Sequence, residues 1–81
     1  MYVYVLTSQK DTNRYYVGIT NNLERRTAEH NNMNEETWTK RYVPWVLHSY
    51  TWFESDSLAR KWESYLKTHS GKAFTRKHFL G

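Results

Sequence analysis

The chain begins with two hydrophobic segments separated by a polar one. Residues 2–6 and residues 15–19 are short runs rich in tyrosine, valine and isoleucine, and the polar residues 8–13 lie between them. Aromatic and β-branched residues favour strands, whereas Asn, Asp and Ser favour turns. The pattern therefore predicts a β-hairpin whose loop is longer than the tightest turns.

Tyrosines recur at alternate positions on these predicted strands, namely Tyr2 and Tyr4 on the first and Tyr16 on the second. Successive side chains of a strand point to opposite faces, so Tyr2 and Tyr4 share one face. Packing alone would favour purely apolar residues there, because a buried hydroxyl without a partner costs free energy. The phenols are therefore candidates for chemistry, with ordinary cross-strand aromatic pairing as the alternative.

A short helix is expected directly after the hairpin. Asn21 or Asn22 suits its N-cap, because the side-chain oxygen can accept a hydrogen bond from a free amide of the first turn. At 3.6 residues per turn, Leu23, Arg26 and His30 fall on one side of this helix. Leu23 marks that side as the inward one, so a guanidinium and an imidazole are expected near the tyrosines.

The middle of the chain predicts a loop and a third strand. Residues 31–39 are polar and lack periodicity, and Lys40 and Arg41 follow among aromatic residues, where they could hold a phosphate backbone or simply be solvated. Both faces of residues 45–53 are largely apolar or aromatic, which predicts a strand covered on both sides. His48 within this strand is expected to be a structural histidine.

The last third of the chain predicts two helical segments. Ser55 or Asp56 is expected to cap a helix that runs to about His69. Gly71, after Ser70, is expected to end it in the left-handed conformation that glycine adopts readily. Residues 73–80 then form a short helix or an extended arm, with Phe74 and Phe79 packed inward and the basic residues outward.

Glu63 lies at the edge of the apolar stripe of that predicted helix, four residues before Lys67. This spacing suits a surface ion pair with the acid first. The alternative is that Glu63 binds a divalent metal, since hard cations prefer carboxylate oxygens.

Composition and charge narrow the classes of function. The 81 residues make one domain, residues 1–81, with a net charge of +4 and no acidic residue after Glu63. Clustered positive charge favours a nucleic-acid partner, so Lys72, Arg76 and Lys77 are expected to contact phosphates, with a merely solvated basic face as the alternative. The absence of cysteine excludes disulfides and thiol chemistry. No stretch is long enough to cross a bilayer and no signal peptide is evident, so a cytoplasmic protein without membrane contact is expected.

The order and spacing of these residues resemble the GIY-YIG nuclease domain. Its signature is Gly-Ile-Tyr, then Tyr-Ile-Gly after ten or eleven residues, then an Arg and usually a His on the next helix. The likeness covers nearly the whole chain. The matching positions here are Tyr2-Val3-Tyr4, Tyr16-Val17-Gly18, Arg26, His30, Pro44-Trp45, the helix holding Glu63, and Ser70 to Phe74.

Two departures from the pattern bear on the chemistry. Tyr2 stands where the signature has its first Gly, which is tolerable if that position needs no special backbone conformation. Ile19 stands where excision-repair relatives carry a Lys beside the second tyrosine. His30 or Lys40 is expected to supply the missing cation.

The fold expected is an α/β (α+β) sandwich, in which helices flank a small, mainly antiparallel three-stranded sheet in β-β-α-β-α-α order. The resemblance implies an endonuclease that hydrolyses DNA with Mg²⁺ or Mn²⁺. It implies that Glu63 binds the metal, that Arg26 binds the phosphate, and that Tyr4 and Tyr16 position or deprotonate water. His30 would orient a tyrosine or relay a proton, and which tyrosine is the base stays open.

Two rival interpretations remain at the level of the sequence. One is a non-catalytic nucleic-acid-binding module of the same fold, and the other is a protein-interaction domain that uses its surface aromatics. RNA stays open as a substrate. Site choice would come from DNA shape, making the enzyme structure-selective, or from a targeting protein partner.

Overall fold

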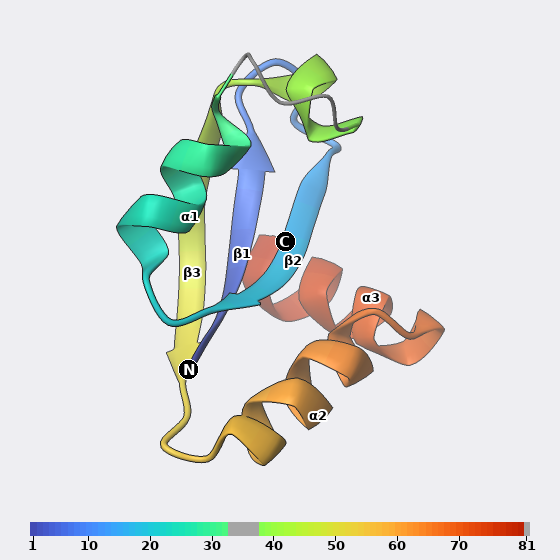
Figure 1. Ribbon diagram of the computed structural model, residues 1–81. Coiled ribbons are helices and arrows are strands. Elements are labelled where there is room, and N and C mark those ends of the chain that lie inside the picture. Colours follow the sequence, from blue (N-terminus) through green and yellow to red (C-terminus); the bar gives the residue numbers. More distant parts are fainter. Residues whose placement is uncertain (33–37, 81) are drawn as a thin grey trace.

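The computed structural model describes residues 1–32 and 38–80, which form one antiparallel sheet with helices on both faces (Figure 1). The strands are β1 (Tyr2–Ser8), β2 (Tyr15–Thr20) and β3 (Trp45–Trp52), in the spatial order β2-β1-β3. The predicted β-β-α-β-α-α order is confirmed. The helical elements are α1 (Leu23–His30), the 3₁₀ helix η1 (Trp38–Tyr42), α2 (Asp56–Leu66), α3 (His69–Thr75) and the terminal π-helical turn η2 (Arg76–Leu80).

The loop between β1 and β2 is closed by its own polar side chains. The Ser8 hydroxyl oxygen accepts hydrogen bonds from the backbone amides of Lys10 and Asp11, and Asp11 accepts one from the amide of Asn13. Such local side-chain to backbone bonds are the reason that Ser, Asp and Asn favour turns. The loop delivers β2 antiparallel to β1, with Tyr4 directly opposite Gly18.

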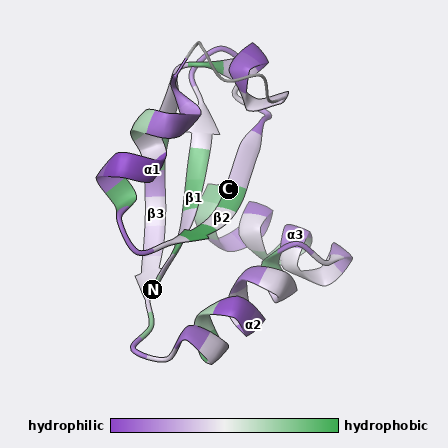
Figure 2. Cartoon of the chain, in the orientation of Figure 1, coloured by the Kyte–Doolittle hydropathy of each residue, from purple (hydrophilic) through white to green (hydrophobic). Residues whose placement is uncertain are grey.

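The two faces of the sheet pack against different helices. Val3, Val5 and Val17 lie on the face covered by α2 and α3, in one cluster with Ala59 and Leu66. The other face carries Tyr4, Leu6 and Trp45, and packs against α1 and η1. Figure 2 shows the hydrophobic colouring concentrated on β1 and β2, whereas α1 and α2 carry many hydrophilic residues. The first face is an apolar core, and the second presents phenols and an indole.

The prediction that the third strand is covered on both sides is wrong. β3 is an edge strand, and the side chains of Tyr50 and Trp52 are 56% and 57% exposed. The eight residues of α1 extend only about 12 Å, whereas the eight residues of β3 extend about 26 Å. Asn31 at the end of α1 hydrogen-bonds the backbone of Trp45, so the helix covers only that end of the strand. His48, expected to be a structural histidine, is exposed on β3.

The prediction that Gly71 ends a helix in a left-handed conformation is also wrong. α2 ends earlier, at Leu66, and the Thr68 hydroxyl caps α3 by accepting from the Gly71 amide at 3.1 Å. Gly71 lies inside α3, and no described glycine has a positive φ. A Cβ atom at this position would collide with the backbone of Tyr65 and Leu66. Glycine is needed here because α3 starts in close contact with the end of α2.

The C-terminal segment, expected as a short helix or an extended arm, is helical. Phe74 and Phe79 pack against the apolar core, as predicted, while Lys72, Arg76 and Lys77 are exposed. Within residues 1–32 and 38–80, no helix has the length and apolar character needed to cross a membrane.

Candidate nuclease site

Tyr4 and His30 form the buried centre of the site. The Tyr4 side chain is 1% exposed on the middle strand, and its hydroxyl lies 3.1 Å from Nε2 of His30, the last residue of α1. The ring of Tyr16, on the adjacent strand, is 4.5 Å from the His30 ring, centroid to centroid. The structure therefore brings together the two tyrosines and the histidine that the sequence pattern had singled out.

Gly18 makes room for this arrangement. It lies opposite Tyr4 in the β1–β2 ladder, and a Cβ atom there would collide with the Tyr4 hydroxyl and crowd the Tyr16 ring. The phenol of Tyr4 thus lies directly over the backbone of β2. The close approach of the Tyr4 phenol explains why the segment Tyr16-Val17-Gly18 ends in glycine.

Burial sets the protonation states of this pair. It raises the pKa of Tyr4 to about 12, and the nearby Tyr16 and Glu63 add to the effect while Arg26 opposes it. Burial also lowers the pKa of His30 to about 4, helped by the positive charge of Arg26 and opposed by Glu29. At neutral pH the site therefore holds a neutral phenol and a neutral imidazole, whose unprotonated nitrogen can accept a hydrogen bond.

Arg26 lies one turn before His30 on α1. Its guanidinium interacts with the Tyr4 phenol and is coupled electrostatically to Tyr16. The Arg26 side chain is 36% exposed, and its ion pair with Glu29 is long, at 3.8 Å. An exposed ion pair of this length contributes little stability, so the guanidinium can exchange Glu29 for a phosphate.

Glu63 lies on α2, which covers the opposite face of the sheet from α1. Its side chain is only 19% exposed, and its Oε2 lies 3.0 Å from the Lys67 Nζ. It is close enough to Tyr4 to raise the pKa of that phenol. Tyr4, Tyr16, Arg26, His30 and Glu63 thus occupy one region, which the β1–β2 hairpin and the two helices α1 and α2 build.

Lys67 is a site residue that the sequence reasoning missed. Its Nζ lies 5.9 Å from the centre of the Tyr16 ring while it also pairs with Glu63. The four-residue spacing from Glu63 was visible, but it indicated only a surface ion pair. His30, one of the expected replacements for the cation missing at Ile19, is uncharged because of its low pKa. Lys67 is instead a cation that lies over the Tyr16 ring.

The donor set at Glu63 suits one kind of metal ion. The described residues contain no group of three or more His, Cys, Asp or Glu side chains that could hold a metal. Mg²⁺ commonly binds through one or two carboxylates and takes its remaining ligands from water and substrate phosphates. A single, partly exposed carboxylate such as Glu63 fits this mode of Mg²⁺ binding, provided that Lys67 moves away from Oε2 of Glu63.

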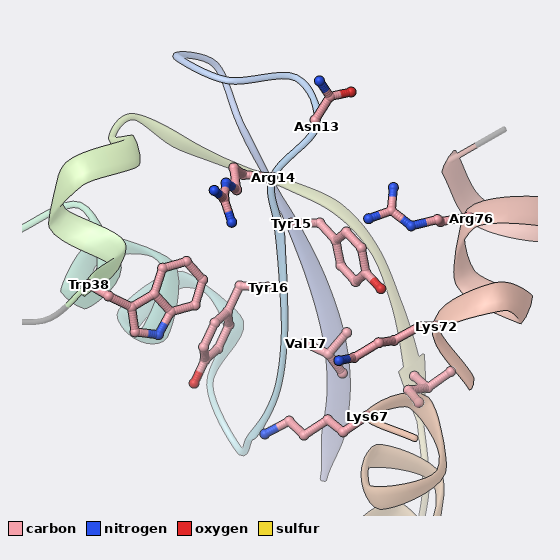
Figure 3. Close-up of a pocket in the computed structure, with 10 residues that line it drawn as sticks. Asn13, Arg14, Tyr15, Tyr16, Val17, Trp38, Lys67, Lys72 and Arg76 are labelled. Atoms are coloured by element: carbon pink, nitrogen blue, oxygen red, sulfur yellow. The ribbon is translucent and has the colours of Figure 1, made fainter. Parts of the chain in front are cut away.

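The basic residues expected to bind nucleic acid separate into two groups. Lys72 and Arg76 line a cavity of about 350 Å³ along the outer edge of β2, together with Tyr16 and Lys67 of the site (Figure 3). Lys40 and Arg41 lie on η1, and Lys77 lies on η2; these three do not line the cavity.

Tyr2, which replaces the first glycine of the signature, occupies an ordinary backbone position. No described non-glycine residue has a positive φ. The Tyr2 ring packs against Tyr50 and Trp52, with centroids 5.5 and 4.8 Å away. The condition under which this replacement is tolerable is therefore met.

Comparisons with known proteins agree with this geometry. The family model described as the GIY-YIG catalytic domain matches residues 1–77. A UPF0213 protein of Clostridium perfringens is 36% identical over 66 residues, which span 82% of this chain and 69% of that protein. No solved structure matches the chain significantly. The chain therefore belongs to the GIY-YIG family of nuclease domains.

Proposed function

We propose that this protein is a metal-dependent endonuclease that hydrolyses phosphodiester bonds of DNA. The observation that carries the proposal is the convergence of Tyr16, Arg26 and Glu63 around the buried pair Tyr4 and His30. Phosphodiester hydrolysis needs a positioned water, relief of charge on the phosphorus oxygens and support for the leaving oxygen. This set of residues offers a group for each need.

Arg26 is the phosphate-binding residue of the proposal. Its planar guanidinium can hold two non-bridging oxygens at once, and its charge is fixed at all relevant pH values. Charge that is already in place when the transition state forms stabilises it without reorganisation. The contact with Tyr4 keeps the guanidinium on the inner side of α1.

Tyr16 is the better of the two tyrosines for contacting water. Tyr4 is buried and its pKa is raised to about 12, so it remains a phenol and has a structural partner in His30. Tyr16 is partly exposed and lines the cavity, where a water molecule and a phosphate can approach. We therefore assign Tyr16 to position or deprotonate the water, and Tyr4 and His30 to hold Tyr16 and Arg26 in place.

Glu63 would hold Mg²⁺ or Mn²⁺. Such an ion, when bound, supplies Lewis-acid stabilisation of the negative charge on the phosphate and on the leaving oxygen. Lys67 must leave Oε2 of Glu63 for this to happen. Since Lys67 already lies beside Tyr16, it stays within the site as a second cation.

Cleavage of labelled DNA tests the proposal. Duplex, single-stranded and branched DNA, and RNA of the same sequence, would be incubated with Mg²⁺, with Mn²⁺ or with EDTA. We expect metal-dependent cutting that falls by at least about 100-fold in Glu63→Gln and Arg26→Ala. Glu54→Gln, which alters an exposed carboxylate outside the site, should retain activity.

Two results would contradict the proposal. Cutting that persists in Glu63→Gln would mean that Glu63 is not the metal ligand. Absence of cutting on every substrate, with folded protein that still binds DNA, would favour a non-catalytic nucleic-acid-binding module.

A further inference from the structure

The cavity along the outer edge of β2 is a groove between two cationic walls. Arg14 enters it from the β1–β2 loop, and Lys72 and Arg76 enter it from α3 and the residue that follows (Figure 3). Lys67 closes one end, beside Tyr16. None of the described residues that line the groove is acidic. A polyanion is the ligand that such a lining attracts.

The floor and one end of the groove are aromatic. The Arg76 guanidinium lies 5.4 Å from the centre of the Tyr15 ring, so a cation and a ring share one wall. Trp38, from η1, packs 5.8 Å from Tyr16 but keeps 51% of its surface exposed. An exposed indole beside cations is the usual means of stacking a nucleobase while its phosphates are held.

We propose that this groove binds an unpaired nucleotide next to the bond that is cut. A base would stack on Trp38, and the phosphates on either side would contact Lys72 and the arginines, Arg14 and Arg76. The groove shares Tyr16 and Lys67 with the site, so the adjoining phosphate would reach Arg26 and Glu63. The substrate class is then DNA with a single-stranded segment. This inference rests on the proposed function for its cleavage step, but not for binding.

Size and stacking both favour an unpaired nucleotide over a duplex. A volume of about 350 Å³ is near the lower end of the range of small-ligand sites, roughly 300–1,000 Å³, which suits one nucleotide. In a duplex both faces of every base are already stacked on neighbours, so the indole of Trp38 would find no free face. An added peptide strand on the edge of β2 is the competing occupant, but cations on both sides of the edge suit phosphates better.

Binding can be measured apart from cleavage. Fluorescence anisotropy of a labelled 15-nucleotide single strand and of its duplex would be recorded in EDTA, in a Glu63→Gln background, at several salt concentrations. Trp38→Ala and Lys72→Ala test the groove. Their matched controls are Trp52→Ala, an equally exposed indole on the other edge of the sheet, and Lys61→Ala, an exposed lysine of α2.

We expect the single strand to bind at least about tenfold more tightly than the duplex. Trp38→Ala should weaken single-strand binding by about tenfold or more, since one stacked base is lost. Lys72→Ala should reduce the slope of log K against log salt by about 0.7, as loss of one phosphate contact predicts. Neither control should change the single-strand affinity appreciably.

The outcomes separate this inference from the proposed function. The groove assignment is wrong if duplex binds as tightly as single strand and if Trp38→Ala and Trp52→Ala have the same single-strand affinity. This holds even if the wild-type protein cuts DNA. Binding that does not weaken with salt also overturns it and points to a peptide strand. Single-strand binding that depends on Trp38, in a protein that cuts nothing, supports the groove and overturns only the nuclease.

Discussion

Protonation of His30 should couple the stability of this protein to pH. The imidazole is 7% exposed and is faced by Tyr4 and Tyr16 from the sheet and by Arg26 and Glu29 from its own helix. Burial, assisted by Arg26, lowers its pKa from the ordinary 6.5 to about 4. The unfolded chain therefore takes up a proton at a pH at which the folded protein does not.

The sign and size of the effect follow from this difference in pKa. Well above pH 6.5, both states are neutral at this position and the stability contribution is complete. As the pH falls, the unfolded state is stabilised by proton uptake until the folded pKa near 4 is reached. One pKa unit corresponds to about 1.36 kcal/mol. Protonation of His30 in the unfolded state should therefore lower the free energy of unfolding by about 2 kcal/mol between pH 8 and pH 5, and by about 3 kcal/mol at pH 4.

Urea denaturation followed by circular dichroism measures this free energy at each pH. The comparison is between wild type and His30→Gln, whose amide can still hydrogen-bond the Tyr4 hydroxyl. The exposed His48 provides the matched control, His48→Gln. Titrating carboxylates contribute to all three proteins and cancel in the differences. If His30→Gln loses stability toward pH 5 as steeply as wild type does, the reasoning about His30 is refuted.

Two glycines give further predictions. Gly18→Ala should destabilise the protein by about 1–3 kcal/mol and lower cleavage activity, because the added methyl displaces the Tyr4 phenol; a urea midpoint equal to that of wild type would show that the phenol has room. Gly71→Ala should also destabilise by about 1–3 kcal/mol, because the obstructing atoms are the backbone of Tyr65 and Leu66. An ordinary helical position would instead gain about 1 kcal/mol from the same change, so a raised midpoint would contradict the close contact of α2 and α3.

Local periodicity was sufficient to predict part of the site. A period of two placed Tyr2 and Tyr4 on one face, and a period of 3.6 placed Arg26 and His30 on one side of the next helix. The connection from β2 to α1 is only two residues long, so that helix had to pack close to the hairpin. Local sequence therefore predicts which of these side chains face one another.

The other parts of the site depend on tertiary arrangement, which periodicity does not record. Glu63 and Lys67 approach the tyrosines from α2 and its C-cap, on the opposite face of the sheet. The sequence alone left Glu63 as either a surface ion pair or a metal ligand, and the family resemblance favoured the metal. The groove exists because β2 is an edge strand, a consequence of the order β2-β1-β3. The position of Gly71 inside α3 likewise depends on how two helices meet, whereas its neighbour Ser70 had suggested a local turn.

The central position of β1 has a consequence for how the molecule is assembled during synthesis. β1 can pair with β2 as soon as the hairpin leaves the ribosome, but its other edge waits for β3, where Tyr2 pairs with Trp52. At about 5–20 residues per second, the ribosome needs seconds to deliver that strand, and pairing between distant segments is itself slow. Tyr4 therefore stays exposed in the nascent chain until β3 and α1 enclose it. The proposed site also needs Glu63 of α2, which follows β3 in the chain, so we expect that no partly made chain can cut nucleic acid near the ribosome.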